Sequence, residues 1–107
     1  MGFVCILEIH IHLPDNGSLK GKRKELLSVK AGLQRHFGAS VAETDHHDLW
    51  QRSTLTAALS ARDAGSLAES SAAVERFLHA RFPDGVRVER GLVSTEEILD
   101  GTTDTDH

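Results

Sequence analysis

Residues 18–24 read Ser-Leu-Lys-Gly-Lys-Arg-Lys, and helical spacing of apolar residues follows them as far as Phe37. Ser18 is a suitable N-cap, because its hydroxyl can accept a hydrogen bond from a first-turn amide. Cations at the positive end of a helix dipole lower the stability of the helix, which suggests that these residues have a function. Amides and basic side chains at a helix start can bind phosphates. We therefore predict a site for an anion or an RNA backbone, formed by Ser18, Lys20, Lys22, Arg23, Lys24, Lys30 and Arg35.

The alternative for this cluster is an ordinary solvated helix face that serves solubility. Gly21 would allow an RNA backbone to approach closely. The chain carries a net charge of −4, but six of its 12 Lys and Arg residues lie between Lys20 and Arg35. Residues 94–107 contain five acidic residues and no Lys or Arg. The body is thus basic along its first helix, and the acidic tail could mask that helix.

Three histidines have a spacing that a metal site could use. His10 and His12 alternate with apolar residues, so their imidazoles share one face of a strand. His46 lies in a polar connection further along the chain. A site formed by His10, His12 and His46 is a speculative interpretation, and no Cys pair supports zinc. We expect histidines that line an open sheet face or bond backbone groups, with no metal and no cofactor.

Trp50 is the only Trp of a chain that has no Tyr. It could stack on a base, anchor an interface, or close the end of the core with its indole N–H satisfied locally. RNA-binding sheets of the ribonucleoprotein type display aromatic residues on their central strands, whereas this chain offers histidines and threonines there. We therefore favour a structural or interface role, with interface residues His10, His12, Trp50 and Arg52.

Hydrophobic periodicity indicates the elements that position these residues. Alternation predicts strands and helical spacing predicts helices, with strands over 3–13, 39–46, 52–61 and 86–93 and helices over 18–37 and 63–81. The order β-α-β-β-α-β predicts an α+β, ferredoxin-like fold with both helices on one face of a four-stranded antiparallel sheet. Residues 1–93 form this domain. Residues 94–107 are predicted to be an acidic, largely disordered tail. It starts with a short helix at Ser94, capped by a capping box from Ser94 to Glu97, and the composition after Gly101 predicts disorder.

Composition excludes several classes of protein. With 107 residues the chain is one domain, and Cys5 reads as a small buried hydrophobe. No run of about 18 apolar residues is present, so we expect no membrane span. The sequence starts directly as a strand, which predicts a cytoplasmic protein.

Two motifs resemble those of a known family. Residues 18–23, Ser-Leu-Lys-Gly-Lys-Arg, resemble its Ser-Leu-Lys-x-Lys-Arg. Residues 41–52, Val-Ala-Glu-Thr-Asp-His-His-Asp-Leu-Trp-Gln-Arg, resemble its Val-Ala-Glu-x-Asp-x-x-Asp-Leu-Trp-Gln-Arg. The chain is similar over residues 3–93 to the YlxP-like group of bacterial proteins, a domain-of-unknown-function family. It departs from that group by its acidic tail and by His47 in place of Gln.

The resemblance implies a ferredoxin-like fold and, from gene clusters shared with translation and ribosome-maturation factors, a role near RNA or the ribosome. It implies no catalytic residue. Our first hypothesis is a non-enzymatic factor that binds RNA or a ribosomal subunit through backbone phosphates. The alternative is a protein-interaction module, a homodimer or accessory subunit that docks through the open sheet face and Trp50. An enzyme is not expected, because the sequence has no nucleophile elbow and no Gly-rich phosphate loop.

Overall fold

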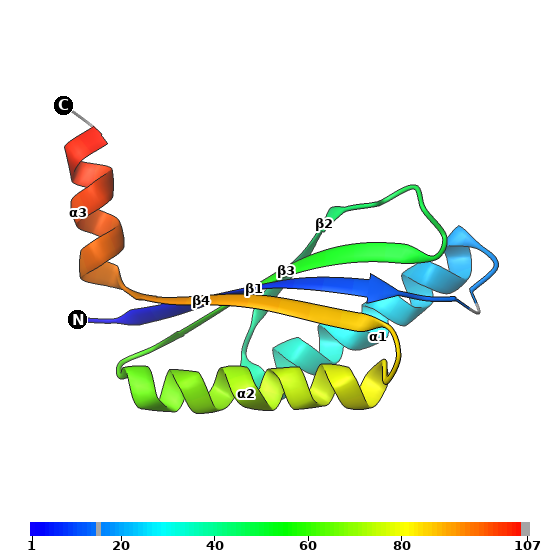
Figure 1. Ribbon diagram of the computed structural model, residues 1–107, viewed down its shortest axis with the longest axis horizontal. Coiled ribbons are helices and arrows are strands. Elements are labelled where there is room, and N and C mark those ends of the chain that lie inside the picture. The colour runs from blue at the N-terminus through cyan, green and yellow to red at the C-terminus, as the bar shows by residue number, and fades with distance from the viewer. Residues whose placement is uncertain (15, 106–107) are drawn as a thin grey trace.

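The computed structural model describes residues 1–14 and 16–105, with side chains as far as residue 100. Its elements in chain order are β1 (Phe3–His12), α1 (Leu19–Phe37), β2 (Ser40–Asp45), β3 (Arg52–Ala61), α2 (Ala64–Arg81), β4 (Val86–Ser94) and α3 (Thr95–Thr105) (Figure 1). The predicted order of strands and helices is confirmed, and one further helix follows it.

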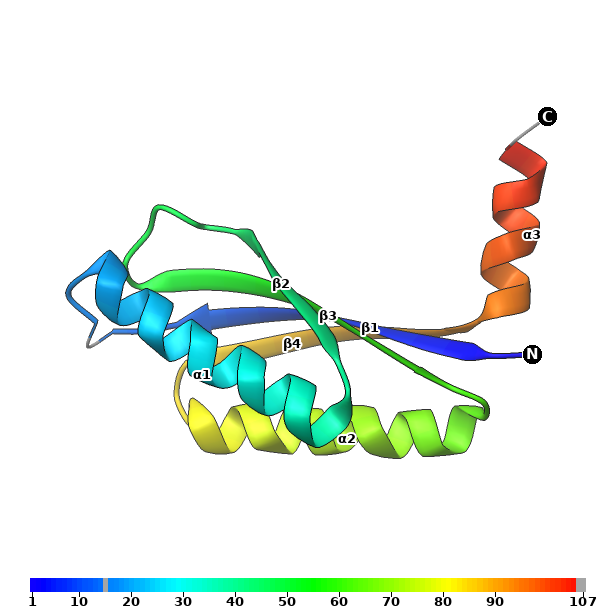
Figure 2. The ribbon, with the colours of Figure 1, turned by 180° about the vertical axis from the view of Figure 1, so that it is seen from behind.

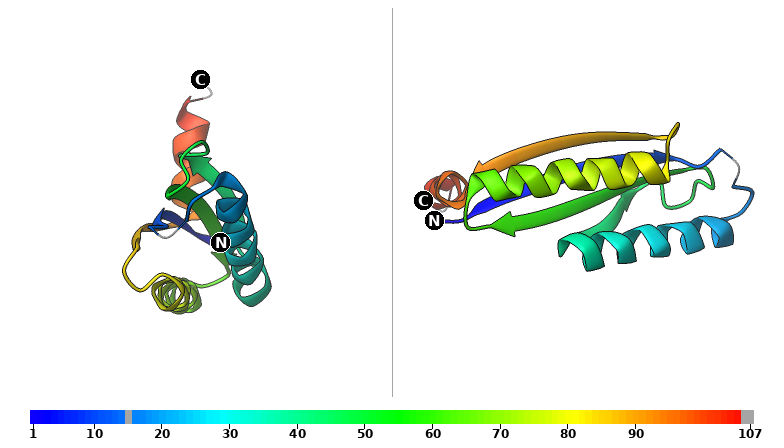
Figure 3. Two further views of the ribbon diagram at one scale, coloured as in Figure 1. Left: turned by 90° about the vertical axis from the view of Figure 1, so that its right-hand side faces the viewer. Right: turned by 90° about the horizontal axis from the view of Figure 1, so that it is seen from below.

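The four strands form one antiparallel sheet in the order β2-β3-β1-β4. Helices α1 and α2 lie side by side on one face of this sheet, and neither covers its other face (Figures 2 and 3). This arrangement is the predicted ferredoxin-like fold. Within the described part of the chain, no helix combines the length and the hydropathy that crossing a bilayer requires.

The core lies between the sheet and the two helices. Cys5, Leu7 and Ile9 of β1 are completely buried there, because alternate residues of a strand point to the same face. Leu55 and Ala57 of β3 lie on the same side and are equally buried. Cys5 is the buried apolar residue that was predicted, and burial raises the pKa of its thiol. The intervening residues of β1 face the opposite, open side of the sheet.

Local capping explains why α1 begins and ends where it was predicted to. The Ser18 Oγ atom accepts a hydrogen bond of 3.0 Å from the Gly21 amide. At the other end Gly38 takes a left-handed conformation with φ of 65°, and its amide donates to the Gln34 carbonyl. Such a conformation suits glycine, which has no Cβ. Asp63 caps α2 in the same way as Ser18, by accepting from the Ser66 amide.

The short helix predicted at Ser94 is present as α3, but it runs to Thr105, beyond Gly101, where disorder was predicted within the acidic tail. The predicted capping box is present: the Glu97 amide donates to Ser94 Oγ at 3.2 Å, and the Ser94 amide donates to Glu97 Oε1 at 3.4 Å. Thr95 also donates its amide to the Gly2 carbonyl at 2.8 Å. Residues 106–107, part of the predicted disorder, lie outside the described residues. Helix α3 projects from the sheet on the side opposite α1 and α2, so it does not mask α1 here (Figure 1).

Candidate functional site

Five cations of α1 lie on its outer side. Lys20, Arg23, Lys24 and Arg35 are exposed, and Lys30 is half-buried. At 100° per residue the five fall within an arc of about 140°, opposite the buried side of the helix. Leu27, which is 65% exposed, lies in the middle of this arc. We call these five cations the basic face of α1.

The basic face has no charge compensation within the part of the chain that the structure describes. None of its five cations takes part in an ion pair there. The only acidic residue of α1, Glu25, binds Arg81 of α2 at 3.0 Å. The outer side of α1 therefore presents five positive charges and no negative charge to solvent. From Lys20 to Arg35 it is about 22 Å long, at 1.5 Å per residue.

Lys22, which was predicted to join this site, is instead only 2% exposed. Its Nζ atom lies 3.0 Å from Glu43 Oε2 and donates hydrogen bonds to the carbonyls of His46 and His47. The prediction is therefore corrected: the Lys22 ammonium binds groups of the protein itself and does not face solvent. The sequence contains one indication that Lys22 is buried: it lies four residues before the buried Leu26 and therefore on the same side of the helix.

Glu43 is the acidic partner that allows a lysine to be buried at this point. Burial by itself would raise the pKa of Glu43, but the hydrogen bonds from Ser53 and Lys22 and the charge of Lys22 outweigh it and leave the pKa lowered. The Ser53 Oγ atom donates to Glu43 Oε2 at 2.7 Å. This cluster fastens the first turn of α1 to the edge strand β2 and to β3.

The segment before α1 is tied to the loop between β2 and β3 by Asn16. Its side-chain amide donates to the Ser18 carbonyl at 2.7 Å and also to the Trp50 carbonyl. A Cβ atom on Gly21 would overlap the side-chain oxygen of Asn16. The space beside Gly21, which was predicted to admit an RNA backbone, is thus occupied by the Asn16 side chain.

Gln51 holds the same loop from its other end. Its carbonyl accepts from the Leu13 amide at 2.8 Å, and its side chain donates to the Pro14 carbonyl at 3.2 Å. Between these fixed points the side chains of Leu49 and Trp50 are 46% and 53% exposed. Trp50 therefore does not close the end of the core, which was its predicted structural role.

The residues predicted to form an interface lie at one end of the open sheet face. His10, His12, His46 and Arg52 line a common hollow there. Trp50 belongs to a neighbouring shallow hollow, which it shares with Arg52. Arg52 is exposed and has no ion pair among the described residues.

The three histidines named for a metal thus come together, but their surroundings differ from a metal site. His10 lies 2.8 Å from Glu89 Oε1 through Nε2 and 3.4 Å from Thr54 Oγ1 through Nδ1. Hydrogen bonding to His10 and the charge of Arg87 lower the pKa of Glu89. Among the described residues, no three His, Cys, Asp or Glu side chains are grouped as a metal ion would require.

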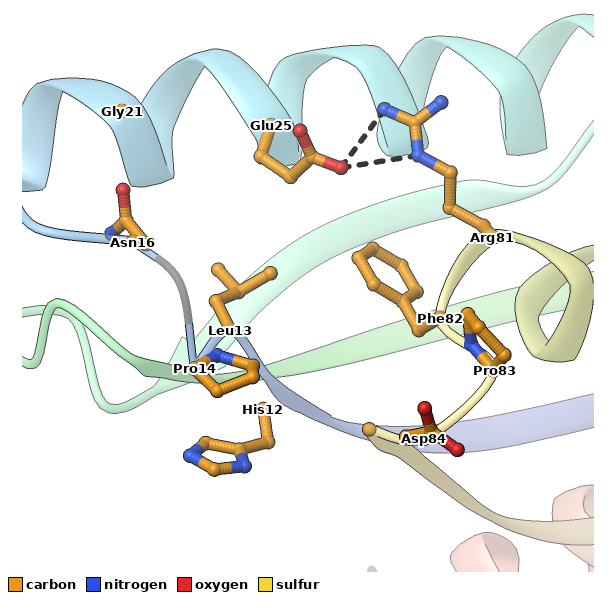
Figure 4. A pocket seen from close by; sticks show the side chains of 11 residues that line it. His12, Leu13, Pro14, Asn16, Gly21, Glu25, Arg81, Phe82, Pro83 and Asp84 are labelled. Atoms are coloured by element: carbon orange, nitrogen blue, oxygen red, sulfur yellow. Dashed lines mark hydrogen bonds and ion pairs between the residues drawn. The ribbon is translucent and has the colours of Figure 1, made fainter.

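A cavity of about 430 Å³ was missed by the sequence analysis. It opens beside the first turns of α1, between the end of β1 and the end of α2 (Figure 4). The buried side chains of Leu13 and Phe82 line it, and the Glu25–Arg81 ion pair borders it. No local motif could have indicated this cavity, because its lining comes from residues 12–25 and residues 81–85, which are far apart in the sequence.

Comparisons with known proteins bear on the family and on the fold. A family model described as "Protein of unknown function (DUF503)" matches residues 4–89. None of the curated proteins matches the chain. The chain is similar to the de novo designed protein Foldit4, with a TM-score of 0.58 and 9% identity over 89% of this chain and 99% of that one. It is also similar to SnoaB, a cofactor-independent oxygenase from Streptomyces nogalater, with a TM-score of 0.52 and 14% identity over 89% and 94%. Likenesses at these identities show the fold alone.

Proposed function

We propose a function for this chain, which belongs to the DUF503 family: it binds the phosphate backbone of RNA through the basic face of α1. The observation that carries the proposal is the set of five uncompensated cations on one outward helix face. The other charged residues of this helix, Lys22 and Glu25, are neutralised by partners within the protein. Cations that are left without partners along about 22 Å suit a polymer with regularly spaced negative charges.

We further propose that the chain is a bacterial YlxP-like member of the family and that its RNA belongs to a ribosomal subunit. The motifs over residues 18–23 and 41–52 support this assignment. The role is that of a cytoplasmic, non-enzymatic factor. Contacts to phosphates position a protein on RNA without reading its sequence, so the binding is weakly sequence-specific and weakens as salt rises.

Co-sedimentation with purified ribosomal subunits over a salt series tests the proposal. The wild-type protein should bind at low salt and dissociate as salt is raised, whereas Arg23→Glu/Lys24→Glu should not bind. The matched control is Arg62→Glu/Arg76→Glu, which reverses two exposed cations outside α1 that have no ion pair among the described residues. Equal loss of binding in both double variants, or no binding by the wild-type protein at low salt, contradicts the proposal.

Self-association through the open sheet face is a second candidate function. It is favoured by Ile6, which is 40% exposed on this face. Val4 lies two residues before Ile6 on the same face and pairs with Val93 of β4. The protomers of such a homodimer would cover one another's apolar side chains. Light scattering over a concentration series should then show a rising mass for the wild-type protein and a constant mass for Ile6→Glu. A wild-type protein that stays monomeric at all concentrations excludes this function.

A further inference from the structure

We infer that the Trp50 ring is a platform on which an unpaired RNA base stacks, beside the phosphates that bind the basic face of α1. This inference rests on the proposed function and adds the class of RNA that is recognised, which is single-stranded. It is carried by three features of the loop over residues 46–51: its fixed backbone, its exposed side chains and its position next to the start of α1.

The backbone of the loop is fixed at several points. Lys22 donates to the carbonyls of His46 and His47, and Asn16 donates to the Trp50 carbonyl. The Leu49 amide also closes a turn by donating to the His46 carbonyl at 3.2 Å. A loop held in this way presents its side chains in a preorganised arrangement, which reduces the entropy lost when a ligand binds.

Two of the six side chains on this fixed loop are large, apolar and exposed. Leu49 and Trp50 are adjacent in the sequence, and both are about half exposed. The exposed Trp50 ring offers a flat apolar surface to a ligand. Every RNA base has a π-face that can stack on such a ring, so stacking does not depend on the base sequence.

The position of the loop favours a nucleic acid over an apolar protein surface. The Asn16 amide donates both to the Trp50 carbonyl and to the Ser18 carbonyl, so the Trp50 backbone lies close to the N-cap of α1. Figure 1 shows the loop between β2 and β3 passing close to the start of α1. The uncompensated cation Lys20 follows two residues later, and Arg52 supplies another on the far side of the loop. The Trp50 ring shares a shallow hollow with Arg52 and also with Asp48. An aromatic ring beside a cation is a combination that proteins use to hold single strands.

The sequence argument against base stacking concerned the open sheet face, and Trp50 does not lie on a central strand of that sheet. A ribonucleoprotein-type sheet presents its aromatic residues from central strands. Here the ring comes from a loop at the end of the sheet, whose backbone lies beside the start of α1. The absence of aromatic residues from the open faces of β1 and β3 therefore does not bear on Trp50.

Tryptophan fluorescence tests the inference directly, because Trp50 is the only Trp and the chain has no Tyr. An unlabelled single-stranded oligoribonucleotide should quench the Trp50 emission, whereas a duplex of the same sequence should bind through phosphates without quenching it. Anisotropy of fluorescein-labelled copies of both RNAs measures affinity independently. Trp50→Ala should weaken binding of the single strand by about tenfold and leave duplex binding unchanged.

Two control variants sharpen this test. Trp50→Phe keeps an aromatic face and should retain most of the affinity, whereas Leu49→Ala, at the exposed neighbouring position, should change it little. Single-strand binding that is neither quenched nor weakened in Trp50→Ala overturns the platform and leaves the phosphate site standing. If neither RNA binds the wild-type protein, the Trp50 platform and the phosphate site on α1 are both overturned. A shift of Trp50 emission on concentrating the protein without RNA would place the ring in a protein interface and also overturn the inference.

Discussion

Lys22 and Glu43 face each other where the first turn of α1 meets the edge strand β2, with Nζ 3.0 Å from Oε2. The side chain of Lys22 is 2% exposed and that of Glu43 is 17% exposed. The same ammonium also holds the carbonyls of His46 and His47. One buried lysine thus fixes the helix that carries the basic face and the loop that carries Trp50 relative to each other.

Removal of the Lys22 charge should strongly destabilise the protein. Lys22→Met leaves the partly buried Glu43 carboxylate without its cation, which costs up to about 3–5 kcal/mol. The double variant Lys22→Met/Glu43→Gln removes both charges and should recover much of this loss. Urea denaturation gives the free energy of unfolding for each. The control Lys24→Met alters an exposed lysine and should stay within about 0.5 kcal/mol of wild type. A double variant no more stable than Lys22→Met contradicts the pairing.

The contribution of Glu43 to stability should depend on pH. Its pKa in the folded protein is lowered from the ordinary value of 4.5. The ionised form therefore stabilises the folded state above that value, and this contribution is lost as pH falls through the lower folded pKa. The difference in free energy of unfolding between wild type and Glu43→Gln should be largest near neutral pH and should shrink below pH 4.5. A difference that is constant from neutral to acid pH would show that Glu43 has the same pKa in both states.

Gly21→Ala should loosen the loop without unfolding the protein. The new Cβ would overlap the Asn16 side-chain oxygen, so the Asn16 side chain has to move, and its Nδ2 atom then gives up the hydrogen bond that it donates to the Trp50 carbonyl. Hydrogen exchange should then be faster in residues 46–51 while the core amides keep their protection. Gly17→Ala is the control, because no heavy atom lies within 4 Å of a Cβ at that position. Equal exchange in both variants would mean that Asn16 does not hold the loop.

The salt dependence of RNA binding should report the number of phosphates that the basic face neutralises. For a single strand, five contacts give a slope of log K against log salt of about −3.5, and removing one cation changes it by about 0.7. Lys20→Ala should therefore give a slope near −2.8 on that scale, measured by fluorescence anisotropy. A control variant with Arg62→Ala should keep the wild-type slope. If Lys20→Ala also keeps the wild-type slope, Lys20 makes no phosphate contact.

Local sequence rules predicted the fold well because the decisive signals are local. The alternation in β1, the Ser18 cap and the Gly38 stop each act within a few residues, and all are present in the structure. The capping box at Ser94 also formed, but a polar composition suggested disorder where α3 continues. A cap specifies where a helix starts and does not specify how far it runs.

The candidate site was harder to predict, because its decisive contacts join distant segments. Lys22 was placed with its cationic neighbours by residue type, although its spacing put it on the buried side. Its burial depends on Glu43, which is 21 positions further along the chain. The exposure of Trp50 likewise depends on bonds from Asn16 and Leu13, which no local pattern reveals.

The burial of Lys22 also gives the protein a built-in chemical reporter. The chain has four lysines, and only Lys22 is buried, while Lys20 and Lys24 are exposed and Lys30 is half-buried. An amine-acylating reagent should therefore modify three lysine side chains of the folded protein and all four of the unfolded chain. Mass spectrometry of a single added acyl group would then follow opening of the α1–β2 contact in solution. The same reagent would neutralise cations of the basic face while leaving the Lys22–Glu43 pair in place.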